Sequence, residues 1–150
     1  PRFSSLEWIV EKGTELGVTE FWLFPAQQSD KATLSPTQVK RLKTISINAL
    51  KQCGRLFLPS ISFKPPLDQW TTLEGSLFFG DVHDASLLQG PFSNPVIFFI
   101  GPEKGFTPSE IEKLRTLNAQ GISLHQNILR TETAAITVLG QFYLKSSSER

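Results

Sequence analysis

Sulfur-containing residues are nearly absent from this chain, which has a single cysteine, Cys53, and no methionine among its 150 residues. One cysteine excludes an internal disulfide framework and fits a reducing compartment such as the cytoplasm. We expect Cys53 to be a small side chain, buried or half-buried on a helix. Because methionine is missing even from position 1, we expect the chain to be part of a longer protein with a further domain upstream.

Long hydrophobic runs are also lacking. The most hydrophobic segment, residues 96–100, has the length of a strand, whereas a membrane-spanning helix needs about 18 apolar residues or more. No signal-peptide pattern is visible at the start of the chain. The sequence therefore favours one globular domain over residues 1–150, with no membrane partner and a cytoplasmic location.

Several motifs of enzyme and binding sites are missing. Two distant histidines, His83 and His125, and one cysteine offer no metal-ligand spacing, so we predict no metal site. The serine-hydrolase G-x-S-x-G, the dinucleotide G-x-G-x-x-G and the P-loop pattern are all absent. His83 falls in an expected loop, where it is either a solvent-facing side chain or an acid–base catalyst.

The formal net charge is only +1, so bulk charge does not indicate a nucleic-acid-binding protein. The positive charges nevertheless gather in one segment, at Lys40, Arg41, Lys43, Lys51 and Arg55. This cluster is either a solvated helix face with cations near the helix C-terminus or a surface that contacts phosphates.

Hydrophobic periodicity and capping signals predict alternating helices and strands. Helices are expected at 5–16, 36–54, 65–70 (short), 107–118 and 131–145, and the tail 146–148 is expected to be frayed. Strands are expected at 19–25, 58–63, 76–81, 96–100 and 121–125. Because most of these strands are continuous apolar runs separated by helices, we predict an α/β fold with a mostly parallel sheet and helices on both faces.

Two strand–loop–helix units are the most informative part of the sequence. In Ile100–Ile111, two glycines, a proline, Glu103 and Lys104 separate a strand from a helix with a capping box. The segment Leu124–Ala135 repeats this layout. We expect the two strands to be adjacent, so that both loops lie where ligands bind in open α/β sheets. Free N–H groups at the helix starts would suit a cleft for adenine and ribose, although a tight turn before a capped helix is the structural alternative for the first loop.

Arg130 stands out within the second loop. It lies just before a helix, where the helix dipole opposes a cation. An unfavourably placed charge indicates a functional role, and a surface ion pair with Glu132 is the alternative.

These two motifs resemble the ribosomal RNA small-subunit methyltransferase E family of the SPOUT superfamily. The family pattern, close to I-G-P-E-G-G-F-T-x-x-E and L-G-x-x-I-L-R-x-E-T-A, corresponds here to Ile100–Glu110 and Leu124–Ala134. Two earlier stretches also match, Glu15–Val18 and Gln52–Arg55. The resemblance covers most of the chain and assigns it to the catalytic, C-terminal domain of the family.

The resemblance implies a deep trefoil knot near the C-terminus, a homodimer with the active site near the interface, and a single SPOUT domain over residues 1–150. It also implies an N-terminal RNA-binding barrel that this chain does not contain. The implied activity is S-adenosylmethionine-dependent methylation of uridine N3 in small-subunit (16S) ribosomal RNA, with the small ribosomal subunit as partner.

The resemblance also implies roles for particular residues. Arg130 and Glu103 are the expected catalytic residues, Arg130 stabilising charge on the base or binding RNA and Glu103 acting as a base or orienting the cofactor. Gln52 and Arg55, together with Arg130, are the expected contacts to RNA, or to the partner subunit in the case of the first two. The expected cofactor pocket consists of Phe79, Gly80, Gly101, Pro102, Gly105, Leu124, Asn127, Ile128 and Leu129.

The sequence departs from the family pattern at two glycines, which are Lys104 and His125 here. We expect the loops to tolerate these side chains, pointing away from the pocket. Two other functions stay open. In the first, the chain is a non-catalytic RNA-binding or ribosome-assembly domain with a decayed pocket; in the second, it is a SPOUT enzyme that methylates another nucleoside.

Overall fold

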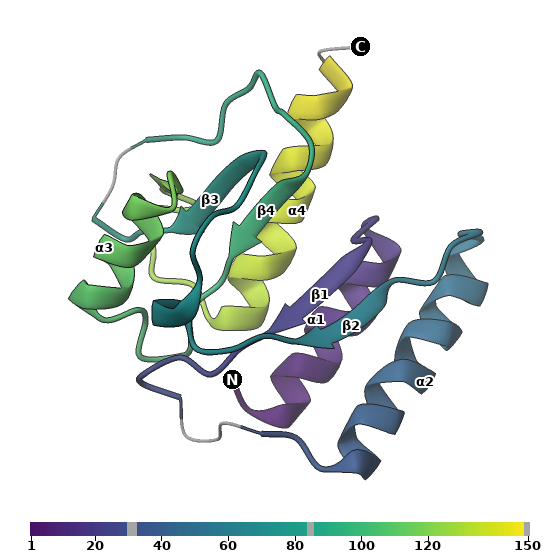
Figure 1. The fold of residues 1–150 in the computed structure, drawn as a ribbon. Coiled ribbons are helices and arrows are strands. Elements are labelled where there is room, and N and C mark those ends of the chain that lie inside the picture. Colours follow the sequence, from purple (N-terminus) through teal and green to yellow (C-terminus); the bar gives the residue numbers. More distant parts are fainter. Residues whose placement is uncertain (30–32, 84–85, 149–150) are drawn as a thin grey trace.

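A computed structural model of the chain describes residues 1–29, 33–83 and 86–148. Helices and strands alternate in the predicted order (Figure 1). The elements are α1 (Phe3–Glu15), β1 (Glu20–Leu23), α2 (Pro36–Cys53), β2 (Ser60–Phe63), the 3-10 helix η1 (Leu67–Gln69), β3 (Ser76–Gly80), β4 (Val96–Phe99), α3 (Pro108–Thr116), β5 (Gln120–Ile122) and α4 (Thr131–Ser148).

The strands form two parallel hydrogen-bonded sheets, one of order β1-β2 and one of order β4-β3-β5. The prediction of an α/β fold with parallel strands is therefore confirmed. The prediction that the two loop-bearing strands, β4 and β5, are adjacent is wrong, because β3 lies between them and pairs with both.

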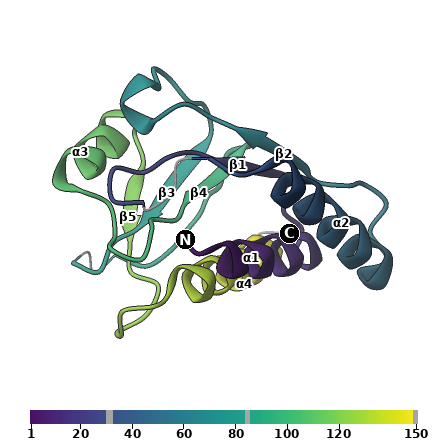
Figure 2. The ribbon, with the colours of Figure 1, turned by 90° about the horizontal axis from the view of Figure 1, so that it is seen from below.

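Helices cover both sides of the strands (Figure 2). Helices α1, α2 and α4 lie on one side, where α1 packs against both α2 and α4. Helix α3 lies on the other side, beside η1. Phe24, the residue after β1, makes a T-shaped contact with Phe99 of β4, and the two ring centroids are 6.4 Å apart.

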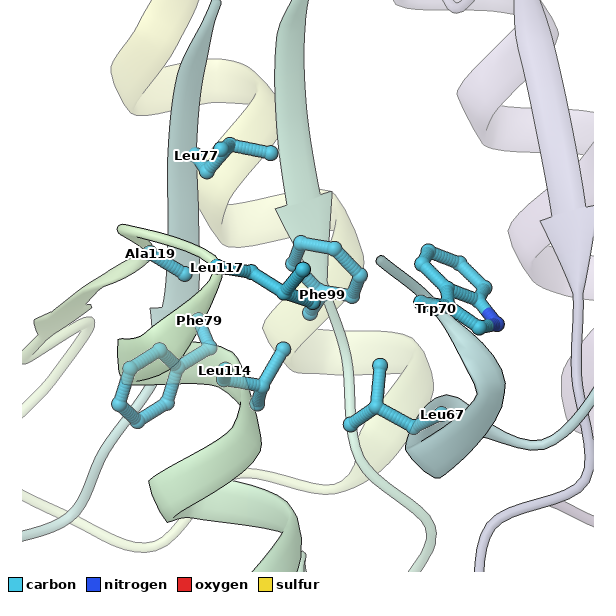
Figure 3. Close-up of a cluster of buried hydrophobic side chains, with 8 residues drawn as sticks. All are labelled: Leu67, Trp70, Leu77, Phe79, Phe99, Leu114, Leu117 and Ala119. Carbon is cyan, nitrogen blue, oxygen red and sulfur yellow. The ribbon is translucent and has the colours of Figure 1, made fainter. Parts of the chain in front are cut away.

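Alternation along β3 separates two hydrophobic cores. Leu77 and Phe79 point towards α3 and pack with Phe99, Leu114 and Leu117 (Figure 3). Phe78 points the opposite way, into a second core with Ile122 of β5 and Val138 of α4. A third core joins α1, β1 and α2 through Leu6, Val10, Phe21 and Leu42. The apolar runs in the sequence therefore reflect burial on both faces.

Capping residues set the starts of α2 and α3 as predicted. Ser35 and Gln38 form a reciprocal capping box before α2, and Thr107 and Glu110 form one before α3. Gly54 ends α2 in the left-handed conformation, with φ of 75°.

Three local expectations are wrong. Cys53 is exposed at the last turn of α2 rather than buried. Strand β5 ends at Ile122, so residues 123–125 already belong to the loop. Residues 146–148 continue α4 instead of fraying, and their serine hydroxyls donate to carbonyl oxygens one turn earlier, as Ser147 Oγ does to Tyr143 O at 2.7 Å. None of the helices in the described ranges has the length and apolar character needed to cross a membrane.

Leu114 provides a test of the α3 core, since its side chain is 0% exposed. We predict that Leu114→Ala lowers the free energy of unfolding by about 2–5 kcal/mol, because it removes buried methyl groups and leaves a cavity. Urea unfolding measures this change. Leu56→Ala, at a side chain that is 88% exposed, is the control and should change the free energy by about 0.5 kcal/mol at most. Equal effects of the two variants would contradict the packing described above.

Candidate functional site

The carboxyl ends of β3, β4 and β5 lie at one edge of the three-stranded sheet, because the strands are parallel. Strand β4 leads into residues 100–107 (the first loop), and β5 leads into residues 123–130 (the second loop). Gly80 ends β3 between them and is exposed. Phe79 is only 1% exposed, with its side chain in the α3 core, so only its backbone can face a ligand at this edge.

The first loop is built around a tight turn at residues 102–105. Gly105 N donates to Pro102 O at 2.8 Å, and Gly105 has φ of 76°, a conformation that favours glycine. A Cβ atom on Gly101 would lie 3.3 Å from Phe106 N, so the chain folds closely back on this position. Pro102 is buried beneath the turn.

Lys104 and His125 have ordinary backbone geometry, although the family pattern has glycine at both places. Both side chains are exposed, and neither residue has a positive φ. His125 also contributes a contact, because its Nδ1 accepts the backbone N–H of Asn127 at 3.0 Å. The turns at 104 and 125 therefore form without glycine.

The second loop presents an apolar side chain to solvent. Ile128 is 84% exposed, whereas Leu129 beside it is half-buried. Asn127 is exposed, and Leu124 is half-buried in the second core. Exposed isoleucine beside exposed backbone is a suitable wall for a planar, partly apolar ligand.

The loops are connected to each other through α4. Thr131 Oγ1, at the first residue of α4, donates to Gly101 O of the first loop at 3.2 Å. Gln141 Nε2 donates to Leu124 O of the second loop at 3.0 Å. The segment after β3 joins the same edge, since Asp81 N donates to Ile122 O at 2.9 Å and Ser123 N to Ser86 O at 2.7 Å.

Glu103 is held by the segment before α1. Its Oε1 accepts the backbone N–H of Arg2 at 2.9 Å. A hydrogen bond from its own backbone N–H lowers the pKa of the Glu103 carboxyl below its ordinary value of 4.5, with a further contribution from the backbone N–H of Arg2 and a partial offset from desolvation. A lowered pKa keeps the group ionised at neutral pH and makes it a weaker proton acceptor.

Arg130 is exposed immediately before α4, and its carbonyl accepts Ala134 N at 2.8 Å. Within the part of the chain that the structure describes, its guanidinium forms no ion pair, so the alternative of a surface pair with Glu132 is not realised. The charge is therefore available at the rim of the second loop.

Gln52 and Arg55 lie away from the two loops. Gln52 is in the last turn of α2 and Arg55 follows the helix. This end of α2 is close to where β1 and β2 begin, whereas the loops follow the ends of β3, β4 and β5 (Figure 1). Arg55 Nη1 donates to Thr14 O and Val18 O, both at 2.8 Å, and so satisfies carbonyls at the end of α1. Gln52 lines a depression of about 430 Å³ between α1 and α2.

Sequence reasoning missed several residues that hold this edge together. Glu110 was recognised only as a capping residue, but it is buried and its Oε1 also accepts Gln27 N at 2.9 Å, which ties the segment after β1 to the start of α3. Asp81 pairs with Arg115 at 3.6 Å. No pattern in the sequence indicates these pairings, nor those of Thr131 and Gln141, because the partners are far apart along the chain.

Among residues 1–29, 33–83 and 86–148, no group of three or more His, Cys, Asp or Glu side chains is arranged to hold a metal ion.

Comparison with known proteins identifies the family. Residues 1–142 match the RNA methyltransferase domain family. Ribosomal RNA small subunit methyltransferase E of Mesomycoplasma hyopneumoniae is 31% identical over 143 residues, which cover 90% of this chain and 62% of that protein. The Bacillus subtilis protein of the same name is 31% identical over 157 residues, covering 93% and 60%.

Solved structures agree with this result. A probable rRNA-methyltransferase from Porphyromonas gingivalis superposes with a TM-score of 0.82 at 28% identity, over 98% of this chain and 64% of that one. A putative methyltransferase from Legionella pneumophila in complex with the bound cofactor SAM gives 0.83 at 28% identity, over 93% and 61%.

The chain belongs to the RNA methyltransferase domain family, and the resemblance to ribosomal RNA small-subunit methyltransferase E is confirmed. It spans about three-fifths of the length of these two relatives, 62% and 60%.

The backbone geometry of the first loop predicts that substitutions at the neighbouring positions 104 and 105 lower the free energy of unfolding by different amounts. Gly105→Ala should lower the free energy of unfolding by about 1–2 kcal/mol, because a side chain is unfavourable at a positive φ. Lys104→Gly, the matched variant, restores the family residue where no positive φ is needed. It should cost at most about 1 kcal/mol, through the larger entropy of the unfolded chain. Urea unfolding of both variants measures this; a larger loss for Lys104→Gly would contradict the assigned turn.

Proposed function

We propose that the chain is the catalytic domain of an S-adenosylmethionine-dependent methyltransferase that acts on N3 of a uridine in small-subunit ribosomal RNA. The observation that carries the proposal is the pairing of the two family motifs at one sheet edge, joined by the Thr131–Gly101 hydrogen bond. Relatives carry the methyltransferase name, and one similar structure holds SAM.

The residues at this edge fit an adenosine-containing cofactor. Gly80 offers exposed backbone, and Ile128 offers an exposed apolar surface. Apart from its chain neighbours, no described residue has an atom within 4 Å of a Cβ position on Gly105. We assign the pocket to the backbone of Phe79 and to Gly80, Gly101, Pro102, Gly105, Leu124, Asn127, Ile128 and Leu129. The bound cofactor supplies an electrophilic methyl group on a sulfonium.

Arg130 and Glu103 take different parts in the proposed reaction. N3 of uridine would become nucleophilic once its proton passes to solvent water; the new N–CH₃ bond would then form as the S–CH₃ bond breaks and the demethylated cofactor leaves as a neutral thioether. The exposed guanidinium of Arg130 stabilises the negative charge that develops on the base. Because the pKa of Glu103 is lowered, we assign its carboxylate to orienting the positively charged cofactor rather than to accepting the proton.

Contacts to RNA extend beyond Arg130. Lys40, Lys43 and Lys51 on α2 are exposed and form no ion pairs among the described residues, as suits a surface that meets phosphates. Arg55 uses Nη1 on α1 carbonyls, which leaves Nε and Nη2 for RNA or a partner subunit. Gln52 lies beside it, at the same end of α2.

The remaining expectations stay proposals. We propose a homodimer, supported by exposed apolar side chains on the neighbouring helices α1 and α4, Trp8, Tyr143 and Leu144. The trefoil knot near the C-terminus, the RNA-binding barrel upstream and the cytoplasmic location follow from the family resemblance. The partner is the ribosomal RNA of the small subunit.

Calorimetry with S-adenosylmethionine tests the cofactor assignment. We predict saturable, one-to-one binding per chain, because the proposed pocket consists of residues at one sheet edge of a single chain. A folded protein that shows no heat of binding would favour the non-catalytic RNA-binding alternative.

Mass spectrometry of ribosomal RNA from a deletion strain tests which nucleoside is methylated. Loss of one N3-methyluridine is expected, and loss of a ribose methyl group or of a methylguanine would instead indicate another nucleoside.

Replacement of Arg130 separates catalysis from cofactor binding. Arg130→Ala should reduce methyl transfer by about 100-fold or more, as expected for removal of a group that stabilises charge in the transition state. Its S-adenosylmethionine affinity should stay within about twofold of the unmodified chain. Single-turnover transfer from radiolabelled cofactor measures the first, and calorimetry the second. Full activity in Arg130→Ala would remove this residue from the mechanism. The matched control is Lys113→Ala, which removes a cation of α3 outside the site and should leave methyl transfer unchanged.

A further inference from the structure

We propose that α4 positions both cofactor loops through two side chains, Thr131 for the first loop and Gln141 for the second. This inference rests on the proposed function for its consequence in cofactor binding, but the positioning itself is a property of this chain. Neither residue belongs to the proposed pocket, and each acts through the loop carbonyl that it binds.

Thr131 is placed to hold the first loop rather than to cap its own helix. Thr131 is the first residue of α4 and follows Arg130, whose carbonyl oxygen accepts the helical N–H of Ala134 at 2.8 Å. The side chain of Thr131 donates from Oγ1 to Gly101 O at 3.2 Å, across 30 positions of sequence. The residue is only 5% exposed, so losing this bond would leave a largely buried polar group without its partner.

Gln141 plays the same part for the second loop. Its Nε2 donates to Leu124 O at 3.0 Å, two residues after the end of β5, and the side chain is partly buried. Leu124 lies where the chain leaves the sheet edge. Holding its carbonyl therefore sets the direction in which residues 125–130 depart.

Helix α4 is a firm base for both contacts. Between Thr131 and Gln141, Ala135 and Val138 are buried, and Val138 packs in the core with Phe78 of β3 and Ile122 of β5. Thr131 and Gln141 are ten residues apart, which is about 15 Å along a helix. One rigid element packed on the sheet thus determines where the two loops stand relative to each other.

The geometry of the pocket depends on this arrangement. The two loops leave strands that are separated by β3, so no ladder hydrogen bonds join β4 directly to β5. A ligand that touches both loops needs them at a constant separation, and preorganised loops bind more tightly than loops that must be ordered on binding.

Amide hydrogen exchange tests the positioning without any cofactor. Thr131→Val keeps the shape but removes the donor, and it should accelerate exchange about tenfold in residues 101–106 while 124–128 stay unchanged. Gln141→Leu should do the reverse. Thr131→Ser, which keeps the hydroxyl, should restore the slow exchange of the first loop. Thr137→Val, on the same helix at a threonine whose hydroxyl forms no hydrogen bond among the described residues, is the control and should change neither loop.

Cofactor binding gives the second readout. Thr131→Val and Gln141→Leu should each raise the Kd for S-adenosylmethionine about tenfold, the effect of roughly one lost hydrogen bond, without changing the KM for RNA. Unchanged exchange of residues 101–106 in Thr131→Val would overturn the proposal. So would an unchanged Kd in both variants where the unmodified chain binds. If the unmodified chain binds no S-adenosylmethionine while the loop-specific exchange is seen, the positioning holds and the proposed function fails.

Discussion

Burial of both faces of β3 is the constraint on which the rest of the structure depends. Phe79 points into the core beside α3, and Phe78 points into the second core, which includes Ile122 of β5 and Val138 of α4. Exposing either side chain to water would lose a large amount of hydrophobic free energy. Helices must therefore cover both sides of the strand. Strands β4 and β5 must also pair on its two edges, so that the backbone groups of β3 are satisfied in the interior.

The candidate site is a consequence of this arrangement. Parallel strands end at the same edge, so the loops after β4 and β5 meet the end of β3 at Gly80. Each loop has its own local structure, the Pro102–Gly105 turn in one and the His125–Asn127 contact in the other. Their relative position comes from α4, whose buried face is part of the core that β3 requires.

Residues of the same chemical type have different roles in this structure, because their neighbours in the fold differ. Arg55 and Arg130 are both arginines in family motifs, but Arg55 is bound to carbonyls at the end of α1, whereas Arg130 is exposed and unpaired among the described residues. Glu103 and Glu110 lie in one motif. Glu110 is buried and accepts hydrogen bonds from the backbone of Gln27 and Thr107, whereas Glu103 is exposed and accepts one from the backbone of Arg2.

Much of the fold could be predicted from the sequence because its causes are local. Capping boxes set the starts of α2 and α3, glycine ends α2, and continuous apolar runs indicate buried parallel strands. The two motifs likewise located the candidate site in the chain. The separation of β4 from β5 by β3 was not predictable, because strand order is decided by which packing buries both faces of the sheet.

The sequence also could not predict four hydrogen-bond partners, those of Glu103, Arg55, Thr131 and Gln141. Each of these bonds joins residues at least ten positions apart and depends on how whole elements pack. The sequence by itself determined the elements, the two motifs and the membership of the family. Only the tertiary structure decided how far apart the loops stand and which charges remain free, because those properties belong to contacts between elements rather than to any one segment.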